Sequence, residues 1–599
     1  RGGQFGSADT GQSEWFIHSI VEQLDELVAD DEKSDKTSEL LVSNDFDMPL
    51  SHVTLRVAWH DNKWNGSICD HPENNTYCNG FNSLLSERIR KRKDEHMDQE
   101  IANHGKFLSE IDYVPPCFWS VNLFGNDHIK VLHDNPAAPK LIPIADDLPP
   151  NSILTWPFSI SFTRTKKEQT ESGAYPKNLE EVRIPRFSAK VHEGKSIAFM
   201  YAKFSNPITE EEQQYLVIGA GIITNKERAS DIKHFGPKSE IEEIKKRPKS
   251  QFKYRNFPSI NWAMRFSFDG YSTVRMPYHE YLAEAEKLDD EAKDGFLNKI
   301  KVSITEPELE WCFKYVAMDI GDDEAIYILT KMRKALITCK DDGVVPRKEM
   351  TGMIEKVDGL LEMAWGMRSY FPGFVNLSRV LLNMQDEPEF DLESFYNDFN
   401  DETNTAPDKE LETILLEPAS FPVSRKYTGH LQELVDRLTQ RNFSIQDFLL
   451  LSMLNLRPFQ FERILDGKLQ LPDHWIRNFD SDVKRSHDTS DIINNPYLLC
   501  EDYISWADSH DNVYGEERDA PVDLFKIDIA YFPDGRFKPK IDLQKTMTFT
   551  DKRRIRALVI RHLNTLENTG SCFTDAKNLQ TAISSYPLYY EIGTEYILP

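Results

Sequence analysis

Residues 189–204 read AKVHEGKSIAFMYAKF, and this stretch decides between two kinds of fold. Its first eight residues fit a relaxed phosphate-loop pattern that ends in Gly194-Lys195-Ser196. A phosphate loop needs a glycine-rich turn followed by a helix, so that backbone N–H groups surround the phosphate. Residues 190–193 contain no glycine, and the apolar run after Ser196 is typical of a buried strand. We therefore interpret the match as chance and predict no complete ATPase site in this chain.

Strand patterns continue on both sides of this stretch. Apolar residues alternate with polar ones at Val53, Leu55, Val57 and Trp59, and further strands are expected at 153–163, 196–204 and 215–223. Basic segments near 84–102 and 238–255 interrupt the pattern. We predict that residues 49–290 form a β-rich α+β domain, preceded at 1–48 by a helix and an acidic linker.

Helical spacing dominates from about residue 278 onward. One apolar stripe comprises Leu309, Cys312, Phe313 and Val316, and a second comprises Ile326, Leu329, Met332 and Leu336. We predict a helical domain at 291–384, an acidic linker at 385–412 and a mostly helical region at 413–599. A short hairpin is expected near 525–541, with Pro533-Asp534-Gly535 as its turn. The predicted fold class is therefore α+β and multidomain.

The bulk composition limits the possible partners. The 599 residues carry a formal net charge of −27, so any contact with nucleic acid must use a local basic patch. Such patches occur at 88–93, 245–255 and 552–556, although each can equally be a solvated face. No apolar run is long enough to span a membrane, and seven cysteines fit a reducing cytoplasm. We interpret the ends at Arg1 and Pro599 as cuts within a longer protein.

Three cysteines in the first fifth of the chain suggest a metal site. Cys69, Cys78 and Cys117 lie in polar, loop-like sequence, whereas core cysteines usually lie in apolar runs. Their thiolates could bind zinc or an iron–sulfur cluster, with His60, His71 or His52 as the fourth ligand. The alternative is three buried cysteines without a metal. The candidate ligands are Cys69, Cys78, Cys117 and His60.

The most specific motif lies near the C-terminal end. Residues 495–502 read NPYLLCED, and residues 551–560 read DKRRIRALVI. In this order and spacing they resemble the Asn-Pro-Tyr signature and the Arg-rich helix of RecD-like superfamily 1 DNA helicases. The resemblance covers roughly 425–599 and implies helix-hairpin-helix-like and winged-helix-like modules that precede the motor domains. The usual Gly-Ile-Gly-Phe hairpin is replaced by residues 519–528, which puts the DNA-backbone role of that loop in doubt.

The front of the chain resembles the N-terminal extension of a subset of large bacterial helicase-like proteins. The shared features include Trp59-His60-Asp61, the three cysteines and Tyr370-Phe371-Pro372-Gly373. This resemblance implies that the cysteines act together, but it does not identify the metal.

Together the resemblances imply a DNA-binding accessory region of an ATP-dependent helicase, with ATP and Mg²⁺ bound by a motor outside this chain. The expected partner is DNA, as single strands or ends. The basic residues expected to contact it are Arg457, Arg463, Lys552, Arg553, Arg554 and Arg556. The alternative is a metal-dependent nuclease or effector domain that uses His52, His60 and Asp61 as ligands.

Overall fold

The computed structural model describes residues 50–57, 59–60, 102, 106, 121–123, 129–134, 143–155, 188–228, 264–313, 317–384, 390–401, 406–466, 469–470, 486–501, 522–568, 573–584, 586 and 592–597. The predicted helix and linker at 1–48, and the basic patches at 88–93 and 245–255, lie outside these residues. The described part is a mixed α and β protein, as the sequence predicts. None of its helices has both the length and the apolar character needed to cross a bilayer.

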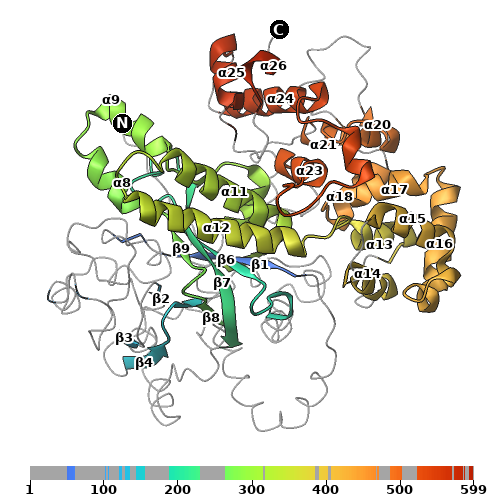
Figure 1. The fold of residues 1–599 in the computed structure, drawn as a ribbon, viewed down its shortest axis with the longest axis horizontal. Coiled ribbons are helices and arrows are strands. Elements are labelled where there is room, and N and C mark those ends of the chain that lie inside the picture. Colours follow the sequence, from blue (N-terminus) through green and yellow to red (C-terminus); the bar gives the residue numbers. More distant parts are fainter. Residues whose placement is uncertain are drawn as a thin grey trace, which may run out of the picture.

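Nine strands of the described part form one mixed sheet (Figure 1). Along the sheet the order is β11 (Ala317–Ile320), β1 (His52–Arg56), β6 (Ile197–Ala202), β7 (Tyr215–Arg228), β8 (Met264–Phe268), β5 (Ser152–Thr155) and β2 (Val121–Asn122). Two short strands, β9 (Val274–Arg275) and β10 (Ser303–Ile304), also pair with β7. β1 runs parallel to β6, and the other described pairings in this sheet are antiparallel. The expected strands are therefore confirmed at β1, β6 and β7, and over the described part of 153–163.

Two small two-stranded sheets contain the remaining described strands. Each is antiparallel: one pairs β3 (Ile129–Asp134) with β4 (Pro143–Leu148), and the other pairs β12 (Leu469–Gln470) with β13 (Ser486–His487).

Helices cover one side of the sheet (Figure 1). They are α8 (Tyr278–Ala285), α9 (Asp290–Asn298), α10 (Pro307–Phe313), α11 (Asp322–Thr338) and α12 (Arg347–Met367). The described residues of both predicted stripes lie on these helices and are buried in the same core as the strands, whereas Val316 lies outside the described residues. Because the sheet and these helices share one core, a domain boundary at 290 does not describe the packing.

A second hydrophobic core begins at Phe371. Its helices are α13 (Phe374–Leu382), α14 (Asp391–Asp401), α15 (Pro407–Leu416), α16 (Thr428–Gln440), α17 (Ile445–Ser452), α18 (Pro458–Leu465), α20 (Thr489–Asn494), α21 (Leu498–Glu501), α23 (Leu524–Tyr531), α24 (Lys552–Asn568), α25 (Ala576–Ser584) and α26 (Thr594–Ile597). The predicted linker at 385–412 differs from this structure, because it includes α14 and the start of α15. Leu392, Phe395 and Leu411 are fully buried there. The prediction of a linker gave weight to the acidic residues and not to the apolar residues spaced between them.

The predicted hairpin at 525–541 is wrong. Residues 524–531 form α23, and all eight of its residues are buried. Phe525, Ile527, Ile529 and Tyr531 alternate along the sequence as strand residues do, but a helix buried on every side can carry apolar residues at any spacing. The alternation therefore did not distinguish a strand from a buried helix.

Candidate nucleic-acid interface

The two motifs near the C-terminal end contact each other. Asn495 is the C-cap of α20, and the chain then enters α21, which packs against α24. Tyr497 is fully buried, and its hydroxyl donates a hydrogen bond to Oδ1 of Asp528 on α23 at 2.7 Å. The pKa of Tyr497 is raised well above its usual value by burial and by the neighbouring charge of Asp528. The Asn-Pro-Tyr segment thus helps to hold a carboxylate beneath the Arg-rich helix.

Arg554 binds that same carboxylate. Its Nε and one terminal nitrogen donate to the two oxygens of Asp528, each at 2.9 Å, and its other terminal nitrogen donates to the carbonyl of Phe549 at 2.8 Å. The Arg554 side chain is only 1% exposed. A guanidinium whose donors are committed inside the protein does not reach a phosphate. The prediction that Arg554 contacts DNA is therefore corrected: this arginine fixes α24 on α23.

The other three basic residues of α24 that were predicted to contact DNA remain at the surface. Lys552 is exposed, and the side chains of Arg553 and Arg556 are 38% and 63% exposed. Arg553 binds Asp551 at 2.7 Å and also donates to the carbonyl of Asn494. Arg556 binds the buried carboxylate of Glu501, the last residue of α21, at 2.9 Å. These two ion pairs orient the guanidinium groups, and part of each group still faces solvent.

Phe549 adds an aromatic ring to this surface. It is one of the large apolar side chains that the described part leaves exposed, at 40%. Its backbone is held by the hydrogen bond from Arg554, so the residue is presented from an anchored loop just before α24. We call Phe549, Lys552, Arg553 and Arg556 the α24 surface. Phe549 was not predicted from the sequence, because an isolated aromatic residue in a turn has no periodic pattern that would place it.

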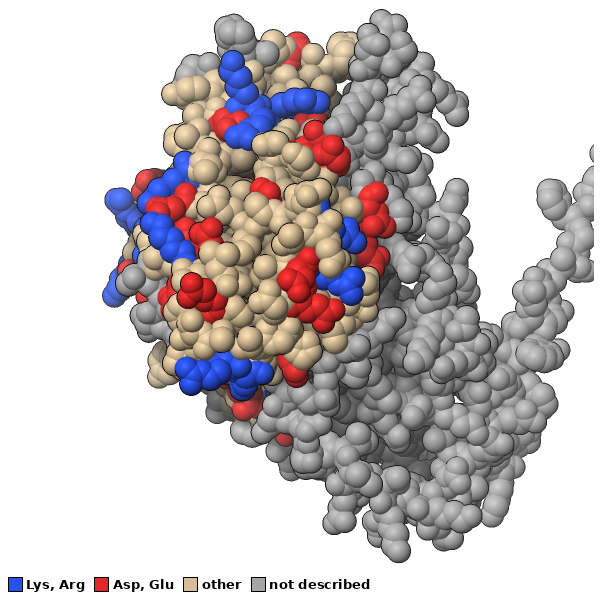
Figure 2. All heavy atoms as spheres, turned by 90° about the vertical axis from the view of Figure 1, so that its right-hand side faces the viewer, with Lys and Arg blue, Asp and Glu red and all other residues tan. Residues whose placement is uncertain are grey.

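Among the described residues, positive charge on the face shown in Figure 2 is local. Figure 2 shows one face, on which basic side chains occur in separate groups with acidic side chains between them. The described residues of this face thus form no single basic patch, and binding of a polyanion there would depend on short-range contacts.

The two predicted arginines of α18 lie on a separate helix. Arg457 is the half-buried N-cap residue of α18, and its backbone N–H donates to Oε1 of Gln460 at 2.9 Å. Arg463 is also half-buried, in the last turn. α18 packs against α13 and α20, and α17 begins at a capping box formed by Ser444 and Asp447. Two short helices, α17 and α18, thus lie in the segment that the resemblance covers.

The predicted metal site falls largely outside the described residues. Cys69, Cys78 and Cys117 are not among them, so that ligand set stays a prediction. His60 is described and is 4% exposed, and its carbonyl oxygen bonds the ring of His279, on which Trp59 stacks at 4.6 Å. Within the part of the chain that the structure covers, no cluster of three or more metal-ligating residues is found.

His52 has a structural role and is not accessible to a ligand. It is fully buried in β1, where Nδ1 accepts a hydrogen bond from the N–H of Ile197 at 2.9 Å. Nε2 therefore carries the proton and donates to Oδ1 of Asp322 at 3.0 Å. Both ring nitrogens are thus used to join β1 to β6 and to α11. Nothing in this geometry favours the nuclease alternative, and its third residue, Asp61, is outside the described part.

The segment that resembles a phosphate loop also has a structural role. Strand β6 begins at Ile197, directly after Ser196, as the sequence predicts. Gly194 adopts a φ of +74°, and the hydroxyl of Ser196 donates to the carbonyl of Ser51 at 2.6 Å. The loop is therefore a turn that seats β6 beside β1.

Comparisons with known proteins add little to this geometry. No family model matches the chain, and no solved structure matches it. An uncharacterized protein of Methanocaldococcus jannaschii is 21% identical over 493 residues, which is 79% of this chain. The match covers 35% of that relative, so the chain spans about a third of its length.

Proposed function

We propose that this chain is a DNA-binding accessory region of an ATP-dependent DNA helicase whose motor is in another part of the protein. One observation carries the proposal: the two motifs that resemble RecD-like helicases bind each other in space. Tyr497 and Arg554 share Asp528, while Glu501 holds Arg556. Motif residues that are 55 to 57 positions apart would be expected to pair if both belong to one module.

In this proposal the α24 surface holds single-stranded DNA. Lys552, Arg553 and Arg556 contact phosphates, and the ring of Phe549 stacks on a base. Stacking on an aromatic ring requires an unpaired base, which favours single strands over duplex DNA. α17 and α18 would form the helix-hairpin-helix-like module, and α24 to α26 the winged-helix-like one. We also infer a cytoplasmic location, zinc or an iron–sulfur cluster at the three cysteines, and ATP and Mg²⁺ only in the motor.

Fluorescence anisotropy with a labelled oligo-dT strand tests this function. We expect the double charge reversal Lys552→Glu with Arg556→Glu to weaken binding about tenfold or more, since both residues would neutralise phosphates. The matched control is Arg347→Glu with Lys348→Glu, which reverses two exposed charges at the start of α12. Replacing Lys552 and Arg556 by Ala should lower the salt dependence of binding by about 1.4 in log–log slope.

The stacking role has a separate test. We expect Phe549→Ala to weaken binding of the single strand about tenfold and of a duplex much less, because stacking contributes about 1–3 kcal/mol per base. Equal losses in the α12 control and in the α24 variant would show that only bulk charge matters. If the wild-type chain binds no DNA at low salt, the proposed function is wrong.

A further inference from the structure

Helix α23 lies between the two hydrophobic cores. Phe525 and Ile529 pack in the first core, where the ring of Phe525 stacks on Tyr327 of α11 at 4.5 Å. Leu524, Ile527, Ala530 and Tyr531 pack in the second core. Although the chain leaves the first core at residue 365, it returns to that core at α23, and the partly buried Phe537 after this helix packs against the same core.

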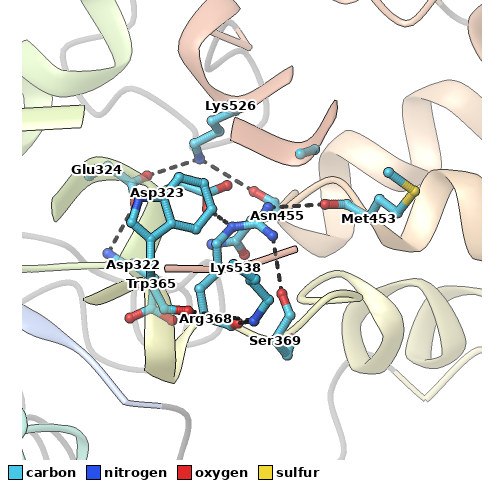
Figure 3. Close-up of polar contacts among 12 residues, drawn as sticks. Asp322, Asp323, Glu324, Trp365, Arg368, Ser369, Met453, Asn455, Lys526 and Lys538 are labelled. Atoms are coloured by element: carbon cyan, nitrogen blue, oxygen red, sulfur yellow. Dashed lines mark hydrogen bonds and ion pairs between the residues drawn. The ribbon is translucent and has the colours of Figure 1, made fainter. Parts of the chain in front are cut away.

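The charged residues of α23 also contact two different parts of the protein. Lys526 points toward the first core, and its Nζ lies 2.6 Å from Oε1 of Glu308 on α10. The same Nζ lies 3.0 Å from Oε1 of Glu324 on α11 (Figure 3). It also donates to the carbonyl of Asn455 in the α17–α18 connection, at 3.4 Å. The side chain of Lys526 is 3% exposed, and Glu308 is 4% and Glu324 6% exposed.

The opposite charges of α23 point toward α24. Asp528 receives the two hydrogen bonds from Arg554, and the N-cap residue Asp523 receives one from Arg561 at 2.7 Å. Asp523 is linked to the other cluster as well, because its Oδ2 accepts from the N–H of Glu308 at 2.9 Å. A continuous set of buried charge contacts therefore runs from α24, through α23, to α10 and α11.

A second group of buried polar contacts joins the two cores near residue 368, where the chain passes from the first core to the second. Arg368, which is 1% exposed, donates to Asp323 of α11 at 2.5 Å and to the carbonyl of Met453, after α17, at 3.2 Å (Figure 3). Lys538, from the segment after α23, donates to the carbonyl of Arg368. The two cores are thus joined by directional polar contacts as well as by apolar packing.

We propose that α23 is a coupling helix that transmits a change at α24 to α10 and α11. Buried charges have no water to replace a lost partner, so they are satisfied only in one relative position of the three elements. A shift of α24 that moves Asp523 or Asp528 must therefore disturb the contacts of Lys526 with Glu308 and Glu324. This coupling does not depend on the proposed DNA binding, because it uses only contacts within the folded chain.

Amide hydrogen exchange of the whole chain, followed by mass spectrometry, tests the coupling without a ligand. The perturbation is Arg554→Met, which removes the α24 contact with Asp528 far from α10. We expect exchange at 307–338 to become at least about threefold faster, the size typical of residues in one network. The matched control is Arg379→Met, which breaks a half-buried ion pair with Glu393 inside the second core and should leave 307–338 unchanged.

A milder variant keeps the test decisive if Arg554→Met does not fold. Tyr497→Phe removes only the hydroxyl that bonds Asp528. We expect it to accelerate exchange in α23 and, to a smaller extent, at 307–338. If the acceleration in every folded variant of the two stays within 489–568, and α10 and α11 exchange as in the wild type, the coupling is refuted.

Discussion

Replacing Lys526 by Met is the sharpest test of the charge cluster beneath α23. The substitution keeps the length and apolar stem of the side chain but removes the ammonium group that lies between Glu308 and Glu324. Two carboxylates are then left together in a site where each is less than 10% exposed. Burial alone would lower the pKa of Lys526, but the two carboxylates outweigh burial and raise it, so the wild-type lysine is charged.

The expected size of the effect follows from the remaining contacts. Removing one partner of a buried ion pair costs about 3–5 kcal/mol. Each carboxylate keeps one backbone hydrogen bond, because Glu308 still accepts from Asp523 at 3.2 Å and Glu324 from Gly321 at 3.1 Å. We therefore expect the lower part of that range, about 3 kcal/mol, as a loss of the free energy of unfolding measured with urea.

Two further variants separate the charge effect from the shape effect. Adding Glu308→Gln and Glu324→Gln to Lys526→Met removes the unpaired charges, and should restore at least half of the lost stability. Lys552→Met, at an exposed position of α24, should change stability by less than about 0.5 kcal/mol. A loss below about 1 kcal/mol for Lys526→Met, or no recovery in the triple variant, would refute the reasoning.

Three other predictions concern packing, pH and metal. Gly373→Ala should destabilise the chain by about 1–3 kcal/mol in urea unfolding, since its Cβ would lie 2.3 Å from the carbonyl of Leu454, whereas Gly359→Ala, in open space on α12, should not destabilise it. Burial and nearby carboxylates raise the pKa of Glu310 from 4.5 to about 7, so its stabilising contribution is complete below pH 4.5 and is lost as pH rises to about 7. Glu310→Gln should flatten the stability profile in that window, and an unchanged profile would contradict the assignment. Elemental analysis should find zinc or iron in the purified chain and less of it in Cys78→Ser; equal metal content would exclude Cys78 as a ligand.

Sequence patterns predicted the elements whose burial is regular. The unbroken apolar run of β6 is buried at every residue, and the stripe of α11 faces the core at helical spacing. α23 was not predicted because its charges are neutralised by residues remote in the chain. Glu308 lies 218 positions before Lys526, and no local pattern reveals such a partner. Alternating apolar and charged residues then indicated a half-exposed strand where a fully buried helix exists.

The candidate site was predicted in part for the same reason. Arg553, Arg554 and Arg556 are alike in the sequence, yet only Arg554 is buried. Its position could have been found from spacing, because Arg554, Ala557, Leu558 and Arg561 follow the i, i+3, i+4, i+7 pattern of a buried helix face. Two of the four residues in this pattern are arginines, which are rarely buried without a partner. The partners, Asp528 and Asp523, are not identifiable from the sequence, so this face was not predicted to be buried.

The most direct measurement of the central claim is lysine footprinting of the full chain with and without bound oligo-dT. Acetylation rates at Lys552 and at Lys348, both exposed, are read by mass spectrometry in one sample. If the α24 surface holds the strand, Lys552 becomes protected as DNA is added while Lys348 reacts at its original rate. Acetylation of Lys552 at an unchanged rate, under conditions where the oligonucleotide is bound, would contradict the account.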